Sequence, residues 1–197
     1  MYIYLTENPY HLHQSEADIA EEQQIIERAK QRPEAFGLIY EKYYSPIYYF
    51  VHKRIGDETI SADVVSQVFL KALDKLSSYK FKGLPFSAWL YRIATNQVNE
   101  FFRRNTRQRV VSLEPEHVSN LLEEWESHGV DPASVLGKLF DELNDDEVQL
   151  LELRFFEERP FQEVAYILDI SETNAKVKVH RVLKKLKKVA SEVLNDC

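Results

Sequence analysis

The feature that most constrains this chain is a stretch near its end, residues 160–188, whose pattern predicts two short helices joined by a tight turn. Pro160 suits the first turn of a helix, because the N–H that proline lacks would be unpaired there in any case. Asp169 and Ile170 form the expected turn; glycine is more usual at the first position, but aspartate tolerates a left-handed backbone better than most residues. Ser171 is expected to cap the second helix. The pattern therefore predicts a helix-turn-helix.

The second helix of this pair combines an apolar stripe with a strongly basic face. The expected buried stripe consists of Ala175, Val179, Val182, Leu183 and Leu186. The cations between and beyond these residues are Lys176, Lys178, Arg181, Lys184, Lys185, Lys187 and Lys188. Only Glu172 opposes them, so residues 171–188 carry a net charge of +6. A basic second helix is the one that enters a DNA major groove, although a charged helix face that is merely solvated is an alternative.

A second basic helix is predicted far from the first in sequence, over residues 86–104. Its apolar stripe consists of Phe86, Trp89, Leu90, Ile93, Ala94, Val98, Phe101 and Phe102. Its polar face consists of Tyr91, Arg92, Thr95, Asn96, Gln97, Asn99, Arg103 and Arg104. The loop before it alternates Tyr79 and Phe81 with Lys80 and Lys82, and flat rings beside cations suit single-stranded nucleic acid. The alternative is that these rings pack onto the protein.

The rest of the chain also follows a helical period, and it has only 5 glycines among 197 residues. A helix is expected from Ser15, and an aromatic-rich helix from Pro33 that Pro46 bends or splits. Another helix from Thr59 has a polar face of Ser61, Asp63, Ser66, Gln67, Lys71, Asp74 and Lys75, with Leu73 on its apolar side. A further helix is expected over residues 133–143, and Asn144 is expected to cap the next one, whose expected apolar residues include Phe155 and Phe156.

The predicted fold is therefore all-α, with two small helical domains joined by an acidic flexible linker and a helix-turn-helix in the C-terminal domain. Expected boundaries are 1–32 for an N-terminal arm and extension, 33–110 for the first domain, 111–131 for the linker and 132–190 for the second domain. The linker expectation depends on weak periodicity and a net charge of −6 over residues 112–135. Such a segment is either a plain tether or an acidic mimic of nucleic acid.

Composition restricts the functions open to this chain. The net charge of −7 is unusual for a DNA-binding protein, so we expect a larger partner to supply part of the affinity. Cys197 is the one cysteine, and no apolar run reaches membrane-spanning length, which together predict a cytoplasmic protein without membrane insertion. His11 and His13 have no further ligand nearby, and no nucleophile–base set or phosphate loop is present. We therefore predict no metal, cofactor, catalytic residue or enzymatic activity.

Three segments give the chain a family resemblance. Residues 61–72 (SADVVSQVFLKA), residues 86–104 with Trp89 and Asn96 on their helix, and residues 153–185 with the helix-turn-helix resemble bacterial sigma factors of the extracytoplasmic-function (ECF) type. The resemblance covers about residues 33–188. It implies that the first domain is sigma region 2, the second is sigma region 4, and the linker threads a basic channel of RNA polymerase.

The resemblance also implies roles for particular residues. Docking on the clamp helices of the largest subunit of core RNA polymerase falls to Asp63, Val64, Gln67 and Lys71. Capture of the −10 promoter element falls to Lys80, Phe81, Lys82, Asn96, Asn99, Arg103 and Arg104. Recognition of the −35 promoter element falls to Glu172, Thr173, Asn174, Lys176, Val177, Lys178 and Arg181. Anti-sigma factors are common partners in this family, and nothing is implied for residues 1–32.

Two other functions fit part of the same pattern. A helix-turn-helix regulator that binds operator DNA without polymerase accounts for the C-terminal residues but leaves the basic helix at 86–104 unexplained. A helical interaction protein that keeps the sigma shape would bind polymerase or a regulator without supporting transcription. A sigma factor that directs core polymerase to promoter DNA accounts for both basic helices.

Overall fold

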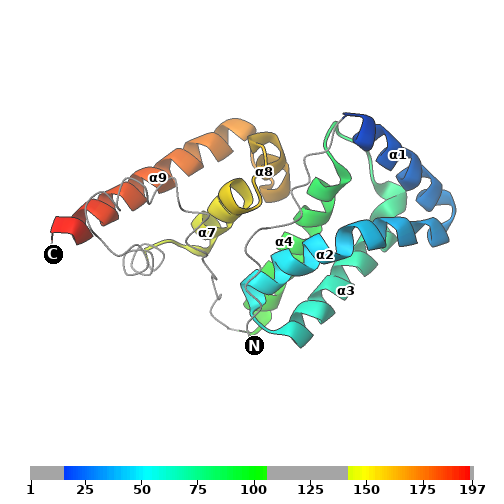
Figure 1. The fold of residues 1–197 in the computed structure, drawn as a ribbon, viewed down its shortest axis with the longest axis horizontal. Coiled ribbons are helices and arrows are strands. Elements are labelled where there is room, and N and C mark those ends of the chain that lie inside the picture. Colours follow the sequence, from blue (N-terminus) through cyan, green and yellow to red (C-terminus); the bar gives the residue numbers. More distant parts are fainter. Residues whose placement is uncertain (1–15, 106–141, 196–197) are drawn as a thin grey trace. The chain divides into compact units, whose positions relative to one another are not determined.

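The computed structural model describes residues 16–105 and 142–195, and within these ranges all regular secondary structure is helical (Figure 1). The described helices fall into two compact units, α1 to α4 and α7 to α9. Several expectations lie outside the described residues: the N-terminal arm with its histidines, the cap at Ser15, the acidic linker, the helix at 133–143 and Cys197. No described helix is both long enough and apolar enough to cross a membrane.

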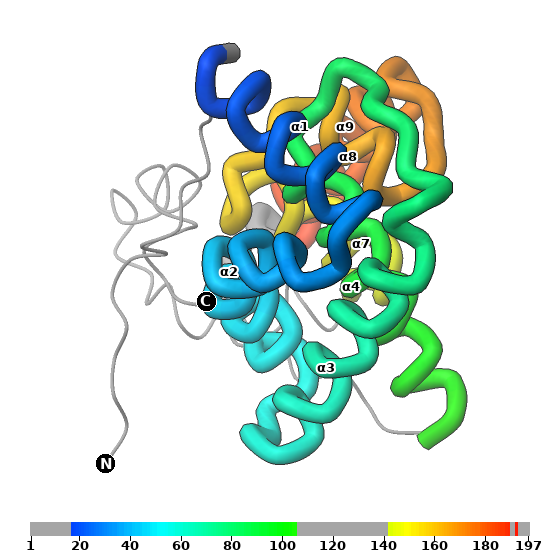
Figure 2. The backbone as a smooth tube through the Cα atoms, turned by 90° about the vertical axis from the view of Figure 1, so that its right-hand side faces the viewer, coloured from blue at the N-terminus to red at the C-terminus, as the bar shows by residue number. Residues whose placement is uncertain are grey.

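The first unit is a bundle of four helices with two short 3-10 turns. Its elements are α1 (Glu16–Gln31), η1 (Pro33–Ala35), α2 (Phe36–Ile55), α3 (Glu58–Lys75), η2 (Leu76–Ser78) and α4 (Phe86–Asn105). Helices α2, α3 and α4 pack against one another in every pairing. Helix α1, the dark blue segment in Figure 2, lies against α2 and against both short turns. The N-terminal extension is thus packed onto the bundle from Glu16 onward.

Helix α2 runs unbroken through Pro46, so of the two expected effects of this proline, a bend or a split, the split is wrong. Pro46 is buried, and the packing of α2 against α3 and α4 along its length holds the helix together despite the lost hydrogen bond. The helix ends at Gly56, whose φ of 72° is the left-handed conformation that glycine adopts without strain. Asp57 then caps α3 by accepting a hydrogen bond from the Ile60 amide at 2.9 Å.

Three residues that were expected on polar faces are buried in this unit. Tyr91 and Thr95 of α4 are 0% and 2% exposed, because α4 packs on both α2 and α3 and needs a wider apolar face than one stripe. The Tyr91 ring lies 4.6 Å from that of Phe50, centroid to centroid. Ser61 is also buried, and its hydroxyl donates to the Asp57 carbonyl at 2.5 Å. Conversely, Leu73 was expected to be buried and is 38% exposed.

The second unit contains α7 (Asp145–Leu151), a π-helical turn η4 (Glu152–Phe156), α8 (Phe161–Leu168) and α9 (Glu172–Asn195). Asn144 and Glu147 form a complete capping box, each side chain accepting from the other's backbone amide. The π-helical turn was not expected from the sequence. It widens the helix after Leu151, and Phe155, expected in the core, is 37% exposed there.

Candidate nucleic-acid interface

The turn between α8 and α9 has the predicted construction. Asp169 adopts the left-handed conformation, with a φ of 58°, and ends α8. The Ile170 amide donates to the Ala165 carbonyl at 3.0 Å, which pairs one of the last carbonyls of the helix. The Ser171 hydroxyl accepts from the Asn174 amide at 3.2 Å and caps α9. Local turn and cap chemistry thus fixes where α9 begins.

Helix α9 separates a buried stripe from an exposed basic face. Ala175, Val179, Val182 and Leu186 are buried, as predicted, while Leu183 is half-buried. All seven residues expected to contact the −35 element are exposed: Glu172, Thr173, Asn174, Lys176, Val177, Lys178 and Arg181. Val177 is 41% exposed, so an apolar side chain lies among the polar ones. An apolar group in such a row suits contact with a thymine methyl group in a major groove.

Not every lysine of α9 belongs to this exposed face. Lys185 donates to the Glu147 carboxylate at 3.0 Å and also to the Glu142 carbonyl, so it ties α9 to the start of α7. Burial raises the pKa of Glu147, but the hydrogen bond from the Asn144 backbone and the bond and charge of Lys185 outweigh it and lower the pKa overall. Lys176 pairs with Glu172 at 2.6 Å across one turn, where both side chains are exposed.

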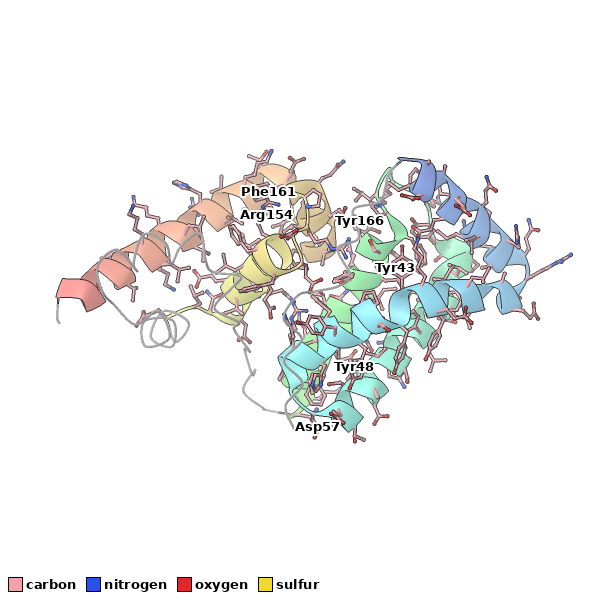
Figure 3. The ribbon with its side chains drawn as sticks, viewed as in Figure 1. Tyr43, Tyr48, Asp57, Arg154, Phe161 and Tyr166 are labelled. Atoms are coloured by element: carbon pink, nitrogen blue, oxygen red, sulfur yellow. The ribbon has the colours of Figure 1, made fainter. Side chains whose placement is uncertain are left out.

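A cation and aromatic cluster at the start of α8 was not predicted. The guanidinium of Arg154 lies over the Phe161 ring, 4.7 Å from its centroid. Figure 3 labels both residues in the second unit. Arg154 also donates to the Arg159 carbonyl at 2.9 Å, and the ammonium of Lys176 lies 5.8 Å from the same ring. The cluster joins η4, α8 and α9. The cluster depends on the π-helical turn, and because the sequence pattern does not predict that turn, it does not predict the cluster either.

The loop from residue 79 to 85 divides the two aromatic residues that the sequence placed together. Tyr79 is buried at 8% exposure, and its ring packs 5.1 Å from Phe86 and 4.9 Å from Trp89. Phe81 is 47% exposed, and Lys80 and Lys82 on either side of it are exposed as well. One ring therefore anchors the loop, and the other is presented to solvent between two cations.

The basic side of α4 is partly occupied by an acidic residue. Asn96, Arg103 and Arg104 are exposed, and Asn99 is half-buried. Glu100 lies among them and pairs with Arg104 at 2.5 Å and with Lys71 of α3 at 3.3 Å. The hydrogen bond from Lys71 and the charge of Arg104 lower the pKa of Glu100. Lys71, which was placed in the docking set, is thus half-buried and joined to α4.

On α3, part of the expected docking set is exposed to solvent, and so are two leucines beside it. Asp63 and Gln67 are exposed one turn apart, whereas Val64 is buried at 9% exposure. Leu70 is 59% exposed, and Leu73 is exposed as well. Sequence analysis overlooked both leucines because an apolar residue on an amphipathic helix is normally assigned to the core. Exposed leucines on one helix are candidates for contact with a protein partner.

Two family models and several known proteins are similar to this chain. Residues 39–108 match the family model described as Sigma-70 region 2, and residues 139–188 match that of Sigma-70, region 4. The ECF RNA polymerase sigma factor BldN of Streptomyces coelicolor is 26% identical over 177 residues, which span 87% of this chain and 67% of BldN. The ECF RNA polymerase sigma factor SigM of Bacillus subtilis is 25% identical over 161 residues, spanning 80% of this chain and 96% of SigM.

The fold is also similar to that of CnrH, solved in complex with the cytosolic domain of CnrY. That likeness has a TM-score of 0.58 at 21% identity and covers 86% of this chain and 97% of the solved one. Two helical units, each matching a sigma-70 region, define an RNA polymerase specificity subunit. The chain belongs to the sigma-70 family, within its ECF group. It therefore directs RNA polymerase to promoters.

Proposed function

We propose that this sigma factor divides promoter recognition between its two units. In this proposal α9 lies in the major groove of the duplex −35 element, while α4 and the loop at 79–85 capture unpaired bases of the −10 element. The observation that supports it most is the exposure of all seven predicted −35 residues beside the buried stripe that holds α9 in place.

The −10 part of the proposal depends on Phe81. A half-exposed ring flanked by Lys80 and Lys82 can stack on a base while the cations pair with phosphates. Asn96 and Arg103 are exposed seven positions apart on α4, and seven residues are close to two helical turns, so both lie on one side of the helix. We assign them to the same captured strand.

For polymerase docking we propose Asp63 and Gln67, extended by the exposed Leu70. A helix that offers a carboxylate, an amide and a leucine to solvent can combine polar register with apolar burial at a protein interface. We further propose that the protein acts in the cytoplasm without catalysing a reaction. CnrH is bound to a cytosolic domain of another protein, and by analogy we propose that an anti-sigma factor regulates this chain.

The test of this division is run-off transcription with purified core RNA polymerase on promoters selected from genomic fragments. Transcripts should require both core and this chain. Mutations in the −35 sequence of the promoter should be compensated only by changes in α9, and a pre-opened −10 region should reduce the requirement for Phe81. If free protein shifted duplex DNA tightly while no fragment gave a transcript, the division between −35 and −10 contacts would be wrong.

A further inference from the structure

One buried carboxylate links the N-terminal extension to the start of α4. Glu22 of α1 is 3% exposed, and its Oε2 accepts a hydrogen bond from the Phe86 amide at 3.1 Å. Its Oε1 accepts from the Lys42 ammonium at 2.8 Å and from the Tyr43 hydroxyl, both on α2. A single side chain of α1 therefore contacts two other helices, one of them 64 positions away in sequence.

The contact at Phe86 satisfies a specific need of α4. The first amides of a helix have no partner within the helix, and the N-terminus carries a partial positive charge. Phe86 is the first residue of α4 and is 1% exposed, so water does not take the place of that partner. The Glu22 carboxylate pairs with the amide and with the helix dipole. It thus fixes the point where the 79–85 loop becomes α4.

Aromatic packing carries this fixed point to the loop. The Phe86 ring lies 6.3 Å from that of Tyr43, 5.1 Å from Tyr79 and 5.1 Å from Trp89. Figure 3 labels Tyr43 in the first unit, and its side chain is fully buried. The ammonium of Lys30, also on α1, lies 5.7 Å from the centroid of the Tyr79 ring. Helix α1 therefore contacts the base of the loop through a carboxylate and through a cation.

We infer that Glu22 is a positioning residue for the loop that presents Phe81, and that α1 is part of the −10 apparatus rather than a separate extension. Glu22 touches no DNA. It holds the first turn of α4, which holds Tyr79, and two residues beyond Tyr79 the chain exposes Phe81. The inference rests on the proposed function of that loop in capturing −10 bases.

The first test is structural and uses the full chain with Trp125→Phe, which leaves Trp89 as the one tryptophan. Glu22→Gln replaces one carboxylate oxygen by a donor and weakens the pairing with Phe86, Lys42 and Tyr43. We expect the emission of Trp89 to shift to longer wavelength as the base of the loop loosens. Glu21→Gln is the matched control, since Glu21 is exposed on the same helix and the charge change is identical. Identical spectra for the two variants would overturn the inference.

The second test separates positioning from general loss of structure. With core polymerase, Glu22→Gln should lower open-complex formation on a duplex promoter about 10-fold, the scale of one hydrogen bond to a charged group. Affinity for core polymerase and binding of the −35 duplex should stay within about twofold of the parent, which corresponds to a few tenths of a kcal/mol. A promoter opened beforehand at −10 should restore most of the lost transcription. Equal losses in all four assays would overturn the inference.

Phe81→Ala distinguishes this inference from the function on which it rests. If Phe81→Ala keeps full open-complex formation, the loop does not capture the −10 strand, and the proposed function of the loop fails together with the inference. If Phe81→Ala loses open complexes while Glu22→Gln does not, the proposed function stands and the positioning role of Glu22 is wrong.

Discussion

At the scale of single residues, Lys178 is the clearest test of what α9 reads. It is exposed beside the buried stripe, three positions after Ala175 and four before Val182. We expect Lys178→Ala to weaken −35-dependent initiation by about 1–3 kcal/mol if the ammonium contacts a base edge, with the loss confined to promoters that carry that base. Run-off transcription across a set of −35 variants measures this. The same loss on every promoter would show a contact with phosphate only.

The control for this variant is Lys188→Ala on the same helix. Lys188 is exposed ten positions further on, and it pairs with Glu192 at 3.5 Å. Its removal should leave the discrimination between promoters unchanged, because ten residues place it roughly 15 Å further along the helix. Loss of promoter discrimination in the control would indicate that the whole of α9, rather than its first turns, contacts bases.

Glu147 makes a prediction about pH. The pKa of its carboxyl is lowered from an ordinary value of 4.5, so folding of the second unit gains stability from the ionised form. That contribution is present above about pH 4.5 and is lost as the pH falls through the lower pKa of the folded state. Thermal unfolding followed by circular dichroism should show a smaller acid-induced fall in Tm for Glu147→Gln than for Asp146→Asn, whose parent residue is exposed. Equal pH profiles would contradict this account.

Sequence analysis identified residues whose partners are close in sequence and missed residues whose partners are distant. Ser171 and Asn144 were predicted as caps, because a cap bonds to an amide three positions away. Glu22 was not identified, because its partners are 20 to 64 positions away and only the packed bundle brings them together. Leu70 was likewise not identified, since nothing in an amphipathic period distinguishes a leucine exposed for binding from one that is buried.

At the scale of elements, the turn between α8 and α9 depends on the left-handed conformation of Asp169. We expect Asp169→Ala to be less stable than Asp169→Gly by about 1 kcal/mol, because a Cβ is strained at this φ and glycine is not. Urea unfolding of the two variants measures the difference. If the alanine variant were the more stable one, side-chain contacts in the turn, and not its backbone conformation, would determine the stability of substitutions at Asp169.

The docking face of α3 gives a second prediction at this scale. Gln67→Ala combined with Leu70→Ser should lower the affinity for core polymerase by about 1–3 kcal/mol without lowering Tm, because both side chains are exposed. Lys75→Ala, which changes an exposed residue in the last turn of the same helix, is the control. Titration of core polymerase with a fluorescently labelled chain gives the affinities. Unchanged binding in the double variant would show that the docking surface does not include these residues of α3.

Most elements were predicted from periodicity, and the differences arise where tertiary packing overrides a local rule. Pro46 lies inside an intact helix because neighbours on two sides hold α2. Tyr91 is buried because α4 has two packing partners, whereas the expected single stripe has room for one. The π-helical turn has no counterpart in a 3.6-residue period, so Phe155 was assigned to the wrong side.

At the scale of the whole molecule, charge is distributed so that DNA contact should depend on polymerase. The chain carries −7 overall, whereas residues 171–188 carry +6. We expect the free protein to bind promoter duplex weakly and the polymerase complex to bind it tightly, with affinity falling steeply as salt rises. Gel shifts at several salt concentrations measure both. Lys184→Ala should reduce the salt slope by about one if that exposed lysine contacts a phosphate.

The π-helical turn at residues 152–156 also has a consequence for chain length. Such a turn holds one residue more than the α-helical turn that it replaces, and here it lies at the end of α7, before the short non-helical segment that leads to α8. We therefore expect this turn to tolerate a one-residue deletion that α8 or α9 would not, because ordinary α-helix could form in its place. Shorter and longer versions of this unit could then share one arrangement of α8 and α9, differing by a single codon at this point.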